Sequence, residues 1–352
     1  MIIINEINPE EYSKISELVE AGKYSSIAIF VEMAIKNQLL LEKSQLLSLD
    51  SISDHNTYDN TLGLTGVSDN ITLRNSMEKP RVVNPITVNS KRNLLPIWGL
   101  INRFSPAKVV LRSLINTLLI EKAEFTNFKD FSEKLASEGS TIRIQLEKFE
   151  KRSDVTRGES FKMGFPMKDA KSRQRFIDTY IGRLRGDNTI GGILGELQFA
   201  VIKRVQNGNA PISVIGLTDY GWQFAKIHSP LIDELLLNQR EVSSPMCDEE
   251  ILFLLNHIRK VRSEDFRFLS FLYSSVKDGV SSPQEISKVV SKYFANNKLG
   301  MSFVNSLQAG AMARLVEMRL IRIEKHGIYS SYRAEQLKPD LCDLLSTSTS
   351  TN

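Results

Sequence analysis

Residues 1–43 constrain the fold most, because they form a unit too small to bury its own apolar faces. The isoleucine-rich stretch at residues 1–7 has the composition of a short strand. Pro9 favours a helix start, and Gly22 favours its end because glycine tolerates the left-handed conformation there. A second amphipathic helix is expected after Ser25 or Ser26, either of which suits its N-cap. Such a unit has too little core alone, so we expect it to dimerise.

The run LVEAGKYSS at residues 18–26, with a strand before it and a helix after it, resembles the ribbon-helix-helix family. The resemblance implies that two strands pair across a dimer and enter the major groove of DNA. It also implies that Ser25 and Ser26, at a helix N-terminus, hold a backbone phosphate. The strand departs from the family pattern, since its polar residues are Asn5 and Glu6 with no Lys or Arg. Whether it contacts bases or only dimerises stays open, as does a helical hairpin packed on the rest of the chain.

Residues 44–92 differ in composition from what precedes and follows them. They are rich in Ser, Asn, Asp, Thr and Gly and lack a sustained apolar period. This pattern is typical of a flexible linker. Short apolar pieces such as Val82, Val83 and Ile86 are the parts expected to dock on a neighbouring domain.

Residues 93–245 have the pattern of a globular domain. Apolar spacing predicts helices at residues 106–120, 128–151, 168–185 and 189–205, a strand at 212–217 and a helix from Asp219. The segment Leu217-Thr218-Asp219-Tyr220-Gly221 resembles the L-T-x-x-G segment that closes many winged-helix domains. We therefore expect a first winged-helix-like domain here.

Residues 246–345 contain the clearest element order. Helices are predicted at residues 251–261, 266–277, 283–294 and 302–318, followed by strands at 320–325 and 328–333 around a His326-Gly327 turn. Ser282 and Pro283 together mark a helix start. This order resembles a winged helix, so a second such domain is expected, with residues 346–352 as a disordered tail. The fold class expected overall is mostly α with small β elements (α+β).

Composition argues against several other classes of protein. The formal net charge of +4 is mildly basic, and Cys247 and Cys342 give neither a disulfide framework nor zinc spacing. The sequence contains no H-E-x-x-H or phosphate-binding glycine motif, and the glycines at 191–195 do not follow a predicted strand. Without an apolar run of membrane length or a leader pattern, we expect a cytoplasmic protein. We expect no catalytic residues, cofactor or metal, although an unfamiliar nuclease stays open.

Basic residues concentrate in the two winged-helix candidates. Residues 143–204 carry 14 Lys or Arg against 8 acids, and residues 259–333 carry 13 against 6. Cations facing phosphates give salt-sensitive affinity for DNA, whereas the plainer interpretation is a solvated face. The residues expected to contact DNA are Ser25, Ser26, Arg173, Arg175, Asn305, Gln308, Arg314, Arg322, Lys325 and Arg333.

The predicted helix at residues 302–318 has two distinct sides. Its apolar side faces a core, and its opposite side carries only small residues: Ser302, Ser306, Ala309, Gly310 and Ala313. A small side would let the backbone approach a DNA groove, with Asn305 or Gln308 pairing with adenine. It would equally suit a helix partner in a dimer.

The sequence therefore predicts a non-enzymatic protein that binds double-stranded DNA, most simply a homodimeric transcriptional regulator. One alternative is a DNA-organising or plasmid-partition protein with little sequence preference. Another is a protein-interaction scaffold, since winged helices also bind proteins.

Overall fold

The computed structural model of this chain describes residues 9–20, 26–27, 70–73, 78–85, 95–151, 160–185, 190–207, 210–297, 299–326 and 329–346. The chain divides into two compact units, Met1–Leu62 and Gly63–Asn352. The first unit contains helix α1 (Pro9–Glu20), which follows the expected helix start at Pro9. The expected strand at residues 1–7 and nearly all of the expected second helix lie outside the described residues.

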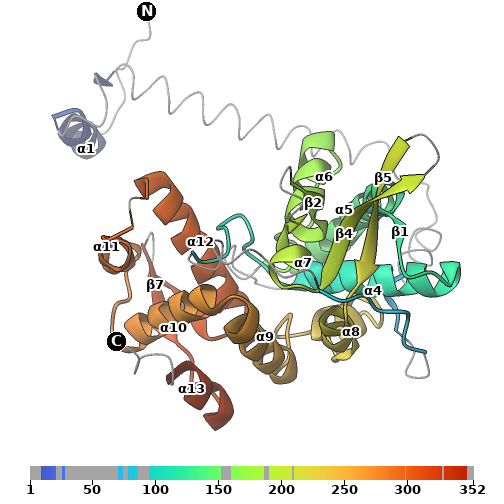
Figure 1. Cartoon of the computed structure of the whole chain (residues 1–352). Helices are drawn as coiled ribbons and strands as arrows, with labels where there is room; N and C mark the ends of the chain where they lie inside the picture. The colour runs from blue at the N-terminus through green and yellow to red at the C-terminus, as the bar shows by residue number, and fades with distance from the viewer. Residues whose placement is uncertain are drawn as a thin grey trace, which may run out of the picture. The chain divides into compact units, whose positions relative to one another are not determined.

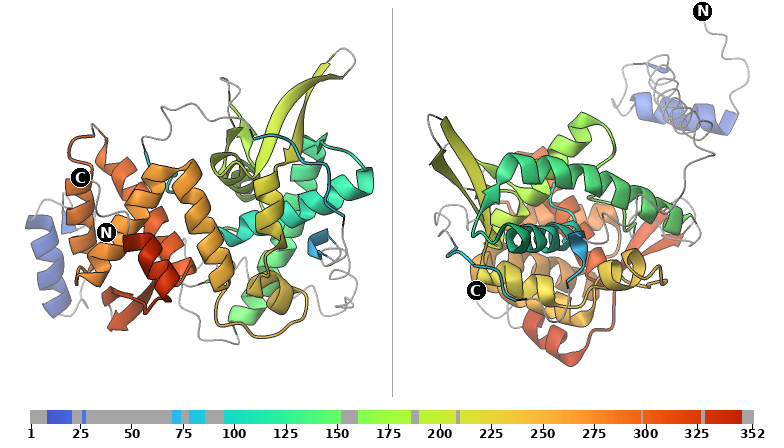
Figure 2. Two further views of the ribbon diagram at one scale, coloured as in Figure 1. Left: turned by 60° about the horizontal axis from the view of Figure 1, so that its bottom comes forward. Right: turned by 90° about the vertical axis from the view of Figure 1, so that its right-hand side faces the viewer.

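The N-terminal half of the second unit combines helices with a small antiparallel sheet (Figure 1). Its elements are α4 (Ser105–Glu121), β1 (Thr126–Asn127), α5 (Phe128–Glu150), α6 (Ala170–Phe176), η2 (Ile177–Ile181), β2 (Arg183–Leu184), β3 (Ile190–Gly191), α7 (Ile193–Glu196), β4 (Ala200–Asn207), β5 (Ala210–Leu217), α8 (Asp219–Lys226) and η3 (Pro230–Leu236). The three-stranded sheet has the order β1-β5-β4, and α4 and α5 both pack against it. The hairpin of β4 and β5 projects beyond these helices (Figures 1 and 2).

The hairpin corrects one expectation, since a helix was predicted at residues 189–205. Two left-handed residues interrupt that stretch, Gly192 at φ 87° and Gln198 at φ 55°, and α7 ends between them. Beyond them, Val201 and Ile202 pair with Gly216 and Ile215 of β5. The β-branched side chains are buried in this pairing, which favours strand over helix.

The described residues of the C-terminal half form five helices and a hairpin. Its elements are α9 (Asp248–Val261), α10 (Ser263–Lys277), α11 (Pro283–Tyr293), α12 (Met301–Glu317), β6 (Ile321–His326), β7 (Tyr329–Ala334) and α13 (Pro339–Ser346). Helices α10 and α11 pack against β7, and α12 packs against β6. The peptide N–H of Tyr332 in β7 donates to the carbonyl of Ser281, between α10 and α11, at 2.8 Å. That connection therefore lies beside β7 at the position of a third strand.

Helix α11 starts where the sequence predicts. The Ser282 hydroxyl accepts from the Glu285 N–H at 3.2 Å, and the Glu285 carboxylate accepts from the Ser282 N–H at 3.0 Å. This reciprocal capping fixes the turn before the helix. With the turn held in this way, the Ser281 carbonyl lies beside β7 and accepts from Tyr332.

Both halves of the second unit share one hydrophobic core, which runs from Ile71 to Leu345. On α9, His257 stacks on Phe199 from the N-terminal half, with 4.9 Å between ring centroids. Its Nε2 lies 2.6 Å from the carbonyl of Leu197. Residues on either side of the expected boundary at 245/246 are therefore packed together.

Parts of the expected linker at 44–92 also pack on this core. Ile71 is 1% exposed, and the side-chain amide of Asn116 on α4 donates to the Asn70 and Thr72 carbonyls at 2.7 and 3.1 Å. The N–H of Val83 donates to the carbonyl of Leu217 at 2.8 Å, in line with the docking expected for that residue. Residues 70–73 and 78–85 thus differ from a free linker because they bury apolar side chains and satisfy backbone groups.

The whole is mostly helical with small antiparallel sheets, as expected for the α+β class. Among the described helices, none has the length and apolar character needed to cross a membrane.

Candidate nucleic-acid interface

The N-terminal turns of α12 present polar side chains to solvent. Ser302, Asn305 and Ala309 are exposed at successive turns of one side. Gln308 is half-buried, and its Oε1 atom is buried with no hydrogen-bond partner among the described residues. Asn305 is therefore freely accessible to a partner, whereas Gln308 is accessible only in part.

The remaining small side of α12 is covered by the chain itself. A Cβ atom on Gly310 would lie 2.4 Å from the carbonyl oxygen of Gly99, and one on Gly99 would lie 1.8 Å from that of Ser306. Both glycines are buried. At these positions the small residues accommodate the segment before α4, so neither a DNA groove nor a partner helix explains them.

Arg314 is the expected DNA contact that the structure contradicts. Its side chain is 0% exposed, and Nη2 donates to Oδ1 of Asp265 at 2.8 Å while Nη1 donates to the carbonyl of Ile101 at 2.7 Å. Burial lowers the pKa of the guanidinium, which the Asp265 charge opposes. The expectation failed because Arg314 faces α10 and the segment before α4, both distant from it in sequence. Arg314 therefore cannot reach a phosphate.

The hairpin of β6 and β7 carries three of the expected contacts. Arg322 and Arg333 both donate to Glu324 Oε1, at 2.8 and 3.4 Å, and their hydrogen bonds lower the pKa of that carboxyl. All three arginine and lysine side chains, including Lys325, are exposed. No residue in the described ranges forms an ion pair with Lys325. Among the described side chains, Lys325 is thus the unpaired cation nearest the end of β6.

Helix α6 holds the other two expected arginines. Arg175 is exposed, and Arg173 is half-buried with its Nε atom buried and without a hydrogen-bond partner in the described part of the chain. Lys168 and Lys171 are exposed around the same turn, next to the capping residue Asp169. This end of α6 is locally basic.

Two further cations were missed in the sequence because β4 was read as helix. Lys203 and Arg204 are exposed on β4 in the projecting hairpin. The Nζ atom of Lys203 lies 3.8 Å from the centroid of the Phe125 ring. The dipeptide Gly208-Asn209 is of a type that favours a hairpin turn, and this sequence signal could have placed a strand before it.

The expected phosphate anchor of the first unit is described only in part. Ser25 lies outside the described residues. Ser26 is half-buried and directly precedes Ile27, which has helical backbone geometry. Its role as an anchor remains a prediction.

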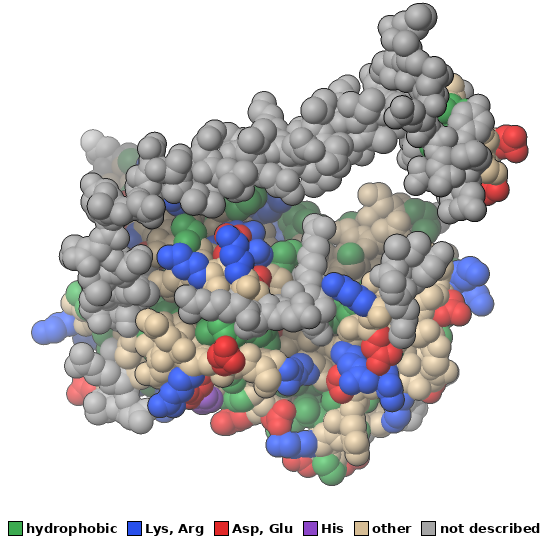
Figure 3. Space-filling view, turned by 180° about the vertical axis from the view of Figure 1, so that it is seen from behind, with side chains coloured by type: hydrophobic (Ala, Val, Ile, Leu, Met, Phe, Trp, Pro, Cys, Tyr) green, Lys and Arg blue, Asp and Glu red, His purple; other side chains and the backbone are tan. Residues whose placement is uncertain are grey.

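Charges of both signs share the surface of the second unit. Figure 3 shows Lys and Arg side chains interspersed with Asp and Glu on the face in view, with no continuous basic patch among the side chains coloured there. Any electrostatic attraction to DNA from this face comes from separate cations on the hairpins and helices. Affinity built this way is sensitive to salt.

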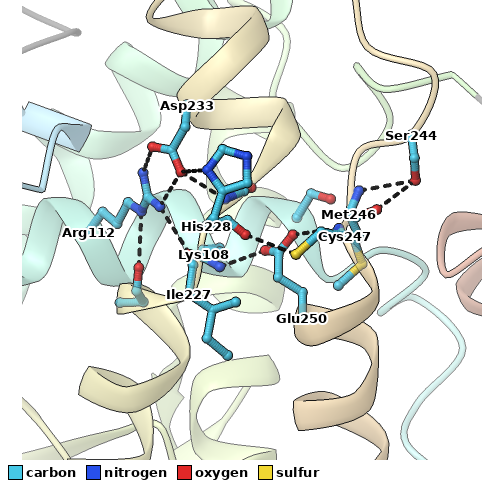
Figure 4. A network of polar contacts seen from close by, with 12 residues as sticks. Lys108, Arg112, Ile227, His228, Asp233, Ser244, Met246, Cys247 and Glu250 are labelled. Carbon is cyan, nitrogen blue, oxygen red and sulfur yellow. Dashed lines mark hydrogen bonds and ion pairs between the residues drawn. The ribbon is translucent and has the colours of Figure 1, made fainter. Parts of the chain in front are cut away.

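The interior contains two ionic groups that join α4 to later elements (Figure 4). Lys108 donates to Glu250 on α9 at 2.6 Å, with side chains 1% and 2% exposed, and burial lowers the pKa of Lys108 to about 8. Arg112 pairs with Asp233 on η3 and donates to the carbonyl of Ala225 at 3.1 Å. The charges satisfy one another, so these groups hold α4, η3 and α9 together.

Neither group is arranged like a metal centre. Cys247 donates its thiol to the carbonyl of His228 at 3.2 Å, and burial raises the pKa of that thiol. Within the described ranges, no cluster of three His, Cys, Asp or Glu side chains could hold a metal ion.

Comparison of the chain with protein-family models, with curated proteins and with solved structures found no match in any of the three.

Proposed function

We propose that this protein is a non-enzymatic, homodimeric DNA-binding protein that acts as a transcriptional regulator. The observation that carries the proposal is a repeated element order in the second unit. In the N-terminal half, α4, β1, α5 and the α6–η2 helix precede the β4–β5 hairpin, with the short elements β2, β3 and α7 between η2 and β4. In the C-terminal half, α10, α11 and α12 precede the β6–β7 hairpin. Both orders resemble a winged helix.

The strand pairing supports the same interpretation. In the first half, β1 pairs with β5 on the side away from β4, with Thr126 opposite Ile215. In the second half, Ser281 hydrogen-bonds to Tyr332 at the equivalent place. In a winged helix the short strand after the first helix pairs with the last strand of the wing. Two halves with this pairing favour tandem winged helices.

The exposed cations fit the expected geometry of DNA contact. The exposed turns of α12 carry Asn305, which would pair with a base edge, and the neighbouring hairpin carries Lys325 and Arg333, which would meet phosphates. In the N-terminal half, Arg175 and Lys203 take the corresponding places on α6 and β4. DNA contact is thus proposed for both halves, with pairing of two chains assigned to residues 1–43.

Binding of duplex DNA at several salt concentrations tests the proposal. The full chain should bind, and the logarithm of its affinity should fall linearly with the logarithm of salt concentration as counterions are released. A selection from random duplexes should then yield a preferred site. Absence of binding at low salt would refute the proposal.

The buried part of α12 favours one alternative, a DNA-organising protein of low sequence preference. With Arg314 and Gly310 in the interior, the exposed polar groups of α12 are few, and the exposed cations are phosphate-type contacts. That protein would coat random duplexes with nearly uniform affinity in the same selection. A protein scaffold would show no salt-dependent binding to any duplex.

A further inference from the structure

A cavity of about 1000 Å³ lies where the two halves of the second unit meet. It is bounded by the C-terminal end of α12 and the start of β6, by residues 241–246 and by residues 335–338. Phe149 and Phe161 close another side and stack with 5.9 Å between ring centroids. The volume is in the range of sites that hold small organic molecules.

The deep part of the cavity is apolar. Met246, Ile251, Val316, Ile321 and Leu341 line it, and none of these side chains is more than 6% exposed. Burying a hydrocarbon body against such a surface is favourable in proportion to the area removed from water.

The buried polar groups of the lining are already satisfied. Glu317 accepts from the Ser105 N–H at 3.0 Å and from its hydroxyl at 2.6 Å. Arg103 donates to the carbonyl of Ala313 at 3.0 Å. These groups form part of the wall and leave little capacity for a ligand.

At the mouth, most charges are paired. Lys338 pairs with Asp248, and Arg322 lies 3.7 Å from Glu335. Arg319 is exposed, lines the cavity and forms no ion pair with a residue in the described ranges. Glu241 is the acid at the mouth that is likewise exposed and unpaired within those ranges.

The backbone of Arg319 is unusual for its residue type. It follows α12 at φ 51°, and its N–H donates to the Val316 carbonyl at 3.0 Å while that of Leu320 donates to the Leu315 carbonyl at 3.0 Å. This is the Schellman ending, in which glycine is the preferred residue. The chain places an arginine there at a conformational cost, and this arginine is an exposed residue of the cavity lining.

We propose that this cavity binds a small amphipathic anion, a carboxylate with a hydrocarbon body, whose head group pairs with Arg319. The apolar wall takes the hydrocarbon, and the guanidinium supplies a charge-assisted hydrogen bond to the carboxylate. Glu241, which also lines the cavity, opposes the anion through its charge. This site is independent of the proposed DNA binding.

Calorimetric titration of the full chain with decanoate, decanol and decylamine, below their aggregation concentrations, tests the assignment. Decanoate should bind with one site per chain and about three- to tenfold more tightly than decanol, with decylamine weakest. Arg319→Gly should abolish the preference for decanoate over decanol, and Glu241→Gln should strengthen decanoate binding. Arg81→Gln, at an exposed arginine that does not line the cavity, should leave all three affinities unchanged.

Arg319→Gly is expected to keep or raise the melting temperature, because glycine suits φ 51° better than arginine. Loss of the preference for decanoate in this variant cannot then be assigned to unfolding. Ser243→Trp and Gln336→Trp, each at an exposed residue of the mouth, should block all three probes. Equal affinity for decanoate and decanol in the natural protein, or binding that survives both blocking variants, would overturn the proposal.

Discussion

Arg314 and Asp265 form an ion pair with both side chains 0% exposed and 2.8 Å between Nη2 and Oδ1. The same Asp265 oxygen accepts from the N–H of Ile97 at 2.9 Å, and Arg314 also donates to the carbonyl of Ile101. One pair of side chains therefore joins α10, α12 and the segment before α4. Removing either partner leaves an uncompensated charge in the interior.

Arg314→Leu should destabilise the fold by about 3–5 kcal/mol, because the carboxylate of Asp265 would remain buried without its cation. Urea unfolding followed by circular dichroism measures the change. The double variant Arg314→Leu with Asp265→Leu should recover part of the loss. A single variant with an unchanged urea midpoint would contradict the role assigned to this pair.

Gly310→Ala should destabilise the second unit by about 1–3 kcal/mol, since the added methyl group would meet the Gly99 carbonyl at 2.4 Å. Gly99→Ala should cost at least as much, because its Cβ would lie closer still to Ser306. Gly300→Ala is the control, because a Cβ there has no neighbour within 4 Å among the described residues, and it should show only the smaller cost of alanine at the N-cap of α12. In thermal unfolding, the melting temperatures of both buried variants should lie well below that of the control.

Asp233 should make stability depend on pH below about 4. Burial opposes its ionisation, but the hydrogen bonds and charge of Arg112 outweigh burial and lower the pKa below its ordinary value of 3.8. The stability from this group is therefore present above pH 3.8 and is lost as pH falls through the lowered folded-state pKa.

Asp233→Asn should lower the free energy of unfolding at pH 7 by about 3 kcal/mol, because Arg112 is left buried without its partner. The gap between this variant and the natural protein should narrow as pH falls from 4 to 2. Glu133→Gln, at an exposed site on α5, is the control. Its free energy of unfolding should depend on pH in the same way as that of the natural protein. A gap that stays constant in acid would rule out the ion pair as its source.

Lys325→Ala and Asn305→Ala should change DNA binding in different ways. Loss of the lysine should reduce the slope of log affinity against log salt by about 0.9 and weaken binding to every duplex. Loss of the asparagine should cost about 1–3 kcal/mol for the preferred site and relax preference at one base. Lys277→Ala, at an exposed residue at the end of α10, is the control. In competition assays with the preferred duplex and a random duplex, it should bind like the natural protein.

Deletion of residues 1–43 should lower the mass of the protein in solution from dimer to monomer while the second unit stays folded. The reason is that this segment is too small to bury its own apolar faces and so needs a partner copy. Light scattering gives the mass, and circular dichroism checks the fold. An unchanged mass would place the dimer contact elsewhere.

Local signals predicted much of the C-terminal half from sequence. The capping pair Ser282 and Glu285 fixed the start of α11, and the predicted helix at 302–318 matches α12 within a residue at each end. The predicted strands at 320–325 and 328–333 overlap β6 and β7. Each of these depends on residues close together in the chain, which is the information a sequence pattern holds.

What failed depends on contacts between distant segments. The helix pattern of Arg314 does not reveal that the chain before α4 covers it, because Ile101 is far away in sequence. The small side of α12 suggested an external partner for the same reason. Its partner at Ser306 and Gly310 is the backbone of Gly99, which is distant in the sequence. Strand β4 was missed because its partner β5, not its own periodicity, decides its conformation.

The hairpins β4–β5 and β6–β7 are attached to one continuous core. Side-chain packing across both halves therefore contributes to the spacing between them. A partner that contacts both hairpins therefore meets two surfaces whose spacing depends on packing in this core. Mutations that loosen this packing would change the spacing between the hairpins and so weaken the fit to the partner. They would do so without altering any group that the partner touches.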